Sequence, residues 1–342
     1  MIALNVFRCF IKRLKYWHLR FYDNKDGIKI SLKNIISTQA MIKKCLFPAA
    51  GYGTRFLPAT KAVPKEMLPV LNKPLLQYAI EEALSAGISN MAIVTGRGKR
   101  AIEDHFDNSI ELESQLKGTS SEHYLKEIKN VIENANFTYV RQSEMLGLGH
   151  AILTGETLIG KETVGVILAD DLCIAEDSVV LEQLSNVYSK YKCSVIAIEE
   201  VPISKVHNYG IVTGSLINDS EDIYQITDLV EKPNEVDAPS NLAVIGRYIL
   251  TPEIFDILKN IKPGKDGELQ ITDALKLQAQ MGNVLGFKFK AKRFDCGSIN
   301  GYLDANNYLA KLKGITDWFS PPLSGASFVS LLNTKKSYHV KY

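Results

Sequence analysis

The sequence predicts an α/β protein built on a mostly parallel, mixed β-sheet that is covered by helices on both faces. Two observations lead to this prediction. Short apolar runs alternate with stretches of helical periodicity through the middle of the chain, which is typical of βαβ units. Polar and glycine-containing motifs directly follow several of the apolar runs. Such motifs are expected there because ligands bind at the carboxyl ends of parallel strands.

The individual elements follow from these patterns. The first strand, over 44–49, runs into a glycine-rich turn, and a helix over 75–86 ends before Gly87. A second strand covers 91–95. Further strands are expected, with helical stretches between several of them, over 138–141, 164–169 and 194–199.

The chain has three segments of different character. Residues 1–40 hold eight Lys or Arg residues against two Asp residues, and we expect this basic extension to be dispensable. Residues 41–313 carry the βα pattern and form the main domain. Residues 314–342 are expected to be a poorly ordered tail. An alternative for residues 2–22 is a basic amphipathic helix that binds a membrane surface or a partner.

Composition excludes several classes of protein. With 342 residues, 46% of them hydrophobic and 23% charged, the chain can bury a large core, and its net charge of +2 gives no argument for nucleic acid. The five cysteines form no C-x-x-C pair and are odd in number, so reduced thiols are expected rather than disulfides or zinc. No apolar run reaches the roughly 20 residues that a membrane span needs. We expect a cytoplasmic protein without a membrane or nucleic-acid partner.

The strongest motif follows the first strand. Residues 48–55 read Pro-Ala-Ala-Gly-Tyr-Gly-Thr-Arg, and residues 64–69 read Pro-Lys-Glu-Met-Leu-Pro. Glycines in such a turn let backbone N–H groups approach phosphates, and Arg55 and Lys65 add positive charge. The turn is not a dinucleotide fingerprint, since Phe56 stands where that pattern needs glycine. A triphosphate under attack at its α-phosphoryl group suits this combination.

Two further motifs follow strands. Gln142 and Gly147 lie in a loop that starts a helix; the Gln142 amide has a donor and an acceptor for the edge of a base such as uracil. His150, in the same loop, is expected to cap or pack the helix. The apolar run over 164–169 delivers Asp170 and Asp171 to its end, and carboxylate oxygens are ligands that Mg²⁺ prefers.

Weaker motifs lie in the second half of the chain. Asp295 precedes a glycine turn. Gly210 precedes a strand, and Glu231 and Lys232 form an acid–base pair before a proline. Glu231 could accept hydrogen bonds from sugar hydroxyls, and Lys232 could hold a phosphate as a point charge. Thr272 is a candidate for lining the same pocket, although its stretch could simply cap a helix.

Taken together, these motifs resemble those of the nucleotide-sugar pyrophosphorylase family. The resemblance covers residues 41–313 and neither extension. It implies a Rossmann-like nucleotidyltransferase fold in a single catalytic domain. It also implies Mg²⁺ as cofactor and a homodimer or homotetramer.

The resemblance also implies a role for each motif residue. The phosphates of the nucleotide would be held by Arg55 and Lys65, and Mg²⁺ by Asp170 and Asp295, with Arg55, Lys65 and Asp170 as the catalytic residues. The remaining roles divide between the two substrates. The nucleotide would be contacted by Ala49, Ala50, Gly51, Glu66, Gln142 and Gly147, and the sugar phosphate by Gly210, Glu231 and Lys232.

The implied reaction transfers a uridylyl group from UTP to glucose-1-phosphate and gives UDP-glucose and pyrophosphate. The expected mechanism is direct displacement, because the attacking phosphate is already ionised and needs no general base. One alternative is a thymidylyl- or adenylyltransferase of the same family. A second is a nucleotide-sugar binding module without turnover. A third is a membrane-associated protein that depends on residues 1–22.

Overall fold

The computed structural model describes residues 42–217, 220–264 and 267–315, all of which belong to one compact unit. The predictions for residues 1–40, and for all of the tail beyond Ile315, lie outside these residues. Within the described ranges, no helix has both the length and the apolar character needed to cross a bilayer.

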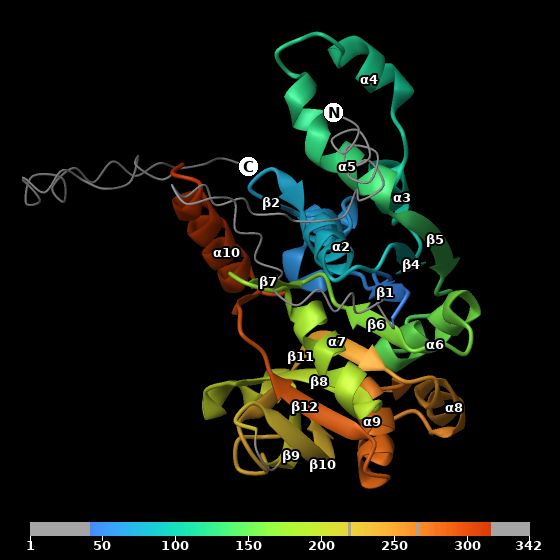
Figure 1. The fold of residues 1–342 in the computed structure, drawn as a ribbon, viewed down its shortest axis with the longest axis vertical. Helices are drawn as coiled ribbons and strands as arrows, with labels where there is room; N and C mark the ends of the chain where they lie inside the picture. Colours follow the sequence, from blue (N-terminus) through green and yellow to red (C-terminus); the bar gives the residue numbers. More distant parts are fainter. Residues whose placement is uncertain (1–41, 218–219, 265–266, 316–342) are drawn as a thin grey trace, which may run out of the picture. The chain divides into compact units, whose positions relative to one another are not determined.

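One nine-stranded sheet forms the centre of this unit (Figure 1). Its strands, in spatial order, are β5 (Asn136–Arg141), β4 (Asn90–Thr95), β1 (Lys44–Pro48), β6 (Val164–Ile167), β11 (Leu242–Leu250), β8 (Ser194–Glu200), β12 (Val284–Lys288), β10 (Ile223–Glu231) and β9 (Gly210–Leu216). The first four strands pair in parallel, and so do β8 and β12. The other pairings are antiparallel, including a second contact of β9 with β11.

Helices cover both faces of the sheet. Along β1, Cys45 and Phe47 face one apolar core and Leu46 faces the other, as the alternation of side chains in a strand requires. The first core is closed by α2 (Leu75–Ser85), α3 (Arg100–Phe106), α5 (Lys126–Asn134) and α7 (Val180–Tyr191). The second is closed by α6 (Leu148–Ile159), α8 (Glu253–Asn260) and α9 (Ile271–Gln280).

Two small ribbons stand apart from the main sheet. In one, β7 (Asp171–Ile174) pairs with β13 (Lys292–Asp295), and their register sets Asp171 opposite Asp295. In the other, β2 (Pro69–Val70) pairs with β3 (Lys73–Pro74). The β7–β13 ribbon therefore brings the two distant acidic motifs of the sequence together. The remaining helical elements are η1 (Thr54–Phe56), η2 (Ala59–Lys61), η3 (Lys65–Met67), α4 (Ile110–Leu116), η4 (Glu122–Leu125), η5 (Ile203–Asn208) and α10 (Ile299–Leu312).

The α/β class, the mixed sheet and the helices on both faces are confirmed. The prediction of a mostly parallel sheet holds for β5, β4, β1 and β6 but is wrong for the other half, where β8 and β12 form the one parallel pair among the described strands. There, β9 and β10 are consecutive antiparallel strands without a helix between them.

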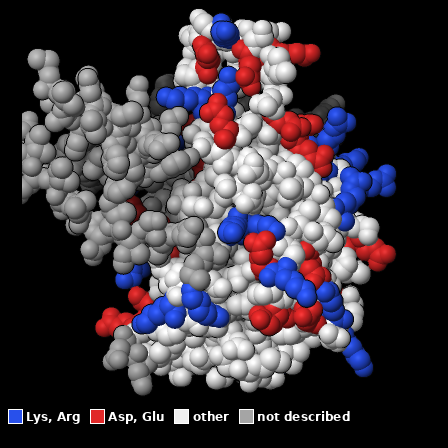
Figure 2. Space-filling view, turned by 45° about the vertical axis from the view of Figure 1, so that its right-hand side comes forward, with Lys and Arg blue, Asp and Glu red and all other residues white. Residues whose placement is uncertain are grey.

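On the face shown in Figure 2, Lys and Arg side chains are interspersed with Asp and Glu side chains.

Candidate active site

The glycine-rich loop begins where β1 ends, and its first residues are held against β4. The N–H of Ala49 donates to the carbonyl of Val94 at 2.8 Å, and Ala49 and Ala50 are buried. A Cβ on Gly51 would meet nothing within 4 Å. The loop thus has a fixed inner side and an open outer side, which suits the approach of a ligand to its backbone.

Gly53 lets this loop fold back onto Lys65. Its φ of +68° lies in the left-handed region, and a Cβ there would stand 2.9 Å from Cβ of Lys65. Lys65 lies on η3 and places its Nζ 2.6 Å from Oδ2 of Asp170. The charge of Asp170 raises the pKa of Lys65. Burial would raise the pKa of Asp170, but the charge and hydrogen bond of Lys65 outweigh it, so that pKa lies below its usual value.

Gly297 marks the point on which the predicted metal and phosphate residues converge. A Cβ built on Gly297 would lie 3.1 Å from Oδ1 of Asp295 and 3.2 Å from Oδ2 of Asp170. The same point is 3.5 Å from Nη1 of Arg55, which also donates to the Gly297 carbonyl at 3.4 Å. The two carboxylates and the two cations of the glycine-rich loop therefore share one small volume.

The two carboxylates fit a magnesium ion as a donor set. Their oxygens are hard ligands, and Mg²⁺ is commonly held by one or two carboxylates while water and phosphate complete its shell. Burial, followed by the charge of Asp171, raises the pKa of Asp295, and a divalent cation would offset both effects. Across the described ranges, no three His, Cys, Asp or Glu residues gather into a metal site. A cation at this site would thus depend on Asp170, Asp295 and ligand oxygens.

The predicted base-contacting residues Gln142 and Gly147 lie between β5 and α6, at the same carboxyl edge of the parallel strands as the glycine-rich loop. Gln142 is buried, with its Nε2 2.8 Å from Nδ1 of His150 and 3.4 Å from the carbonyl of Gly147. Gly147 has a φ of +93°, and a Cβ there would stand 3.0 Å from the carbonyl oxygen of Leu269. The 2.8 Å contact between the two side chains shows that His150 packs against Gln142.

Glu66 is not the solvated carboxylate that a surface position would give. It is only 2% exposed and accepts a 2.7 Å hydrogen bond from Nζ of Lys99 on Oε2. Its other oxygen, Oε1, has no partner among the described residues. Burial raises the pKa of Glu66, and Lys99 opposes the rise only in part. A buried acceptor without a partner is what a ligand donor would satisfy.

The sugar-side residues meet across strands. Glu231, at the end of β10, lies opposite Gly210 of β9. Its Oε2 accepts from Oγ1 of Thr272 at 3.0 Å, and its Oε1 lies 3.2 Å from Nζ of Lys232. A Cβ on Gly210 would stand 2.6 Å from Cγ2 of Thr272. The structure thus brings together four residues that are scattered in the sequence.

Three residues that support the candidate site were missed in the sequence. Lys99 ends a Gly-Arg-Gly-Lys run directly after β4, and this strand–glycine–cation pattern could have revealed it. The buried pair of Arg247 and Glu82 had no local signal. Arg247 donates to the carbonyls of Leu168 and Asp171 at 3.1 and 2.8 Å, while Glu82 binds its Nε and Nη2. The pair fixes the turn that carries Asp170.

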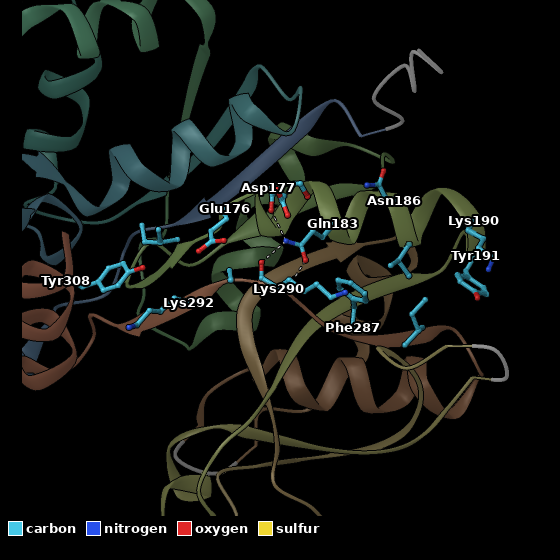
Figure 3. A pocket seen from close by; sticks show the side chains of 15 residues that line it. Glu176, Asp177, Gln183, Asn186, Lys190, Tyr191, Phe287, Lys290, Lys292 and Tyr308 are labelled. Atoms are coloured by element: carbon cyan, nitrogen blue, oxygen red, sulfur yellow. Dashed lines mark hydrogen bonds between the residues drawn. The ribbon is translucent and has the colours of Figure 1, made fainter. Parts of the chain in front are cut away.

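One cavity lies away from these residues. It has a volume of about 710 Å³ and is lined partly by α7 and by residues 290–292. Figure 3 shows Gln183, Lys290 and Lys292 among the side chains that line it. Gln183 spans part of its wall, donating to the carbonyl of Lys290 at 3.0 Å. The lining contains none of the predicted site residues.

A sequence model of the nucleotidyl transferase family matches residues 46–311. The chain belongs to this family. The match spans all the motif residues above, from the glycine-rich loop to the turn at Gly297. It confirms the family resemblance seen in the sequence.

Relatives within the nucleotidyl transferase family agree with this assignment. A UTP–glucose-1-phosphate uridylyltransferase from Pseudomonas aeruginosa is 61% identical over 269 residues, which are 78% of this chain and 96% of the relative. An apo UDP-glucose pyrophosphorylase structure is 60% identical, with a TM-score of 0.77 over 80% of this chain and 99% of that one. A UDP-glucose pyrophosphorylase in complex with UDP-glucose is 58% identical, with a TM-score of 0.74 over 79% of this chain and 99% of that one.

Proposed function

We propose that this chain transfers a uridylyl group from UTP to glucose-1-phosphate, which gives UDP-glucose and pyrophosphate. The observation that carries the proposal is the convergence of Asp170, Asp295 and Arg55 on Gly297, with Lys65 bonded to Asp170. Carboxylates and cations in one volume suit phosphoryl chemistry, in which charge neutralisation supplies most of the catalysis. The choice of UTP and glucose-1-phosphate rests on the relatives at 58–61% identity.

The proposed mechanism is a direct displacement. An oxygen of the glucose-1-phosphate phosphate attacks the α-phosphorus of UTP, and the bond from that phosphorus to the bridging oxygen breaks. Pyrophosphate leaves with the electron pair, so no proton transfer to the protein is required. The role of the protein is to align the reactants and neutralise charge.

Each cationic side chain has a position suited to one part of this reaction. Lys65 has three N–H donors and uses one on Asp170, which leaves two for the phosphates of UTP. Arg55 lies beside the same carboxylate and would steady the leaving pyrophosphate. Lys232, whose side chain is 53% exposed, would bind the phosphate of the sugar, and Glu231 would accept from its hydroxyls.

The proposal includes Mg²⁺ as cofactor, held by Asp170 and Asp295. When bound, the ion would supply positive charge at the phosphate oxygens of the two substrates. The buried oxygen of Glu66, together with Gln142 and Gly147, would contact the uracil. Backbone groups of Ala49, Ala50 and Gly51 would contact the base and ribose. The parallel strands β5, β4, β1 and β6 would then act as the Rossmann-like nucleotide half of the sheet.

The deciding experiment measures pyrophosphate release. UTP, dTTP and ATP are each combined with glucose-1-phosphate or galactose-1-phosphate, with Mg²⁺ or with EDTA. We expect the highest kcat/KM for UTP with glucose-1-phosphate, and loss of turnover in EDTA that added Mg²⁺ restores. A preference for dTTP or ATP would favour the thymidylyl- or adenylyltransferase, and binding of UDP-glucose without turnover would favour the binding module.

Three further expectations belong to the same proposal. Deleting residues 1–40 should leave kcat/KM unchanged, since the catalytic residues all lie within 41–313; loss of activity would assign the extension a role. A homodimer or homotetramer is testable by light scattering during gel filtration. A cytoplasmic location is testable by cell fractionation.

A further inference from the structure

Asp171, the neighbour of Asp170, does not face the point shared by Asp170 and Asp295. Both of its carboxylate oxygens are engaged elsewhere in the protein. Oδ2 accepts from the N–H of Gly246 at 3.0 Å, and Oδ1 accepts from Nη1 of Arg293 at 2.6 Å. Asp171 therefore anchors the turn that carries Asp170.

Arg293 extends this anchor toward the sugar side. It lies on β13 two residues before Asp295, so both side chains are on the same face of the ribbon. Its side chain is only 8% exposed, and each of its nitrogens has a partner. Nε donates to Glu199 at 2.7 Å, and Nη2 donates to the hydroxyl of Tyr209 at 3.0 Å.

Tyr209 connects Arg293 to Lys232. The guanidinium of Arg293 lies 5.2 Å from the centre of the Tyr209 ring, and the carbonyl of Tyr209 accepts from the N–H of Lys232 at 2.9 Å. The φ of Lys232 is +44°, in the left-handed region that a lysine rarely adopts. Its backbone therefore depends on contacts of this kind to stay in place.

We propose that Arg293 and Tyr209 are positioning residues that fix Lys232, the lysine assigned to the sugar phosphate, relative to Asp170 and Asp295. The chain of contacts runs from Asp171 through the guanidinium and the phenol to the backbone of Lys232. It sets the separation between the two substrate phosphates. This inference rests on the proposed function for its effect on the reaction, but the chain of contacts itself can be tested without substrate.

The test substitutes Tyr209→Phe, which keeps the ring under the guanidinium and removes only the hydroxyl. Tyr188→Phe is the matched control, because the Tyr188 hydroxyl bonds only Thr163, at 2.9 Å, among the contacts found in the described chain. Hydrogen exchange of a peptide that contains Lys232 is measured first, without substrate. We expect faster exchange in Tyr209→Phe than in the wild type and in Tyr188→Phe. Equal exchange in all three would overturn the link, whatever reaction the protein catalyses.

Kinetics then test the consequence. With UTP and glucose-1-phosphate, Tyr209→Phe should raise the KM for the sugar phosphate about 10-fold, since a hydrogen bond to a charged group is lost. Its kcat and the KM for UTP should change less than about 2-fold, because the nucleotide side is untouched. A wild type that releases no pyrophosphate would refute the proposed function alone. An active wild type with an unchanged KM in Tyr209→Phe would refute the inference alone.

Arg293→Lys is the second variant. A lysine keeps the charge but cannot reach Asp171, Glu199 and Tyr209 together in the planar geometry of a guanidinium. We expect the same rise in sugar-phosphate KM as for Tyr209→Phe together with a lower kcat, because Oδ1 of Asp171 also loses its partner. Thermal unfolding of both variants is followed in parallel. An Arg293→Lys protein that is stable and has wild-type KM and kcat would contradict the positioning role.

Discussion

The two halves of the sheet bring their candidate binding residues together in different ways. In the nucleotide half, β1, β4, β5 and β6 run parallel, and short motifs at their carboxyl ends deliver the side chains. In the remaining strands, which form the proposed sugar half, Gly210 and Glu231 meet because β9 and β10 pair as antiparallel strands. The candidate residues of the first half lie in loops that are contiguous in sequence. Those of the second half come together through contacts between strands.

The two halves should therefore respond differently to substitution. In the proposed function, the charged side chains Arg55, Lys65 and Asp170 would neutralise charge where bonds form and break, so their loss should act on kcat. Glu231 and Thr272 would orient the sugar ring through hydrogen bonds, so their loss should act mainly on the KM for glucose-1-phosphate.

The largest effect is expected for Asp170→Asn. The substitution removes a carboxylate from the proposed metal site and the ion pair with Lys65 at 2.6 Å. We expect kcat to fall about 10³-fold, which corresponds to about 4 kcal/mol in activation free energy. Pyrophosphate release at saturating substrates measures it.

Asp256→Asn is the control for this change, because Asp256 is 82% exposed and lies 3.7 Å from Lys259 in a surface pair. It should keep wild-type kcat. A near wild-type rate for Asp170→Asn would remove Asp170 from the metal site and would weaken the contrast between the halves.

A large loss of stability is expected for Glu82→Gln. The Glu82–Arg247 pair is buried, and Arg247 lies on β11, where the parallel strands meet the rest of the sheet. Removing one partner leaves a buried charge unpaired, which costs roughly 3 kcal/mol. Urea denaturation at pH 7 measures the change in the free energy of unfolding.

Glu156→Gln is the matched control, since Glu156 binds Lys259 at 2.6 Å in an exposed pair. Its loss of stability should be much smaller than that of Glu82→Gln, because water screens the pair. Equal losses in the two variants would show that Arg247 does not need Glu82 to hold the turn before Asp170.

The same contrast explains what could be predicted from the sequence. The first strands, the helix from Leu75 and the glycine-rich loop follow from local patterns, because each is a contiguous run with its own period or turn residues. The antiparallel pairing of β9 with β10 depends on the register between two separate runs, which neither run encodes by itself. Arg247 and Arg293 were missed for a related reason. An arginine within a strand carries no sign of the carboxylates that it meets after folding.

A smaller effect is expected for Gly147→Ala, which tests the nucleotide half at the start of α6. The new Cβ would crowd Glu268 at 2.9 Å and Leu269 at 3.0 Å, and the φ of +93° is unfavourable for alanine. We expect the KM for UTP to rise about 10-fold, because a shift of about 1 Å in this loop would displace Gln142 as well. Steady-state kinetics at saturating glucose-1-phosphate measures it.

Gly160, at the other end of α6, provides the control. Its φ is also positive, at +71°, but a Cβ there would meet nothing within 4 Å. Gly160→Ala should lower stability through backbone strain alone, by roughly 1–3 kcal/mol, and should leave the KM for UTP unchanged. A rise in KM in both variants would mean that helix strain, and not crowding of the base site, is responsible.

The smallest effect is expected for Thr272→Val in the sugar half. The hydroxyl of Thr272 donates to Glu231 at 3.0 Å, while its methyl group packs against Gly210. Valine keeps a methyl group in that place and removes only the donor. Since Glu231 is partly exposed, water can replace the lost bond, and the cost should be about 1 kcal/mol, or about a 5-fold rise in the KM for glucose-1-phosphate.

Thr163→Val, which breaks a hydrogen bond to Tyr188 on α7, should leave both KM values unchanged. If Thr272→Val instead lowered kcat by as much as Asp170→Asn, the sugar half would take part in the chemical step, and the proposed separation of roles between the two halves would be wrong.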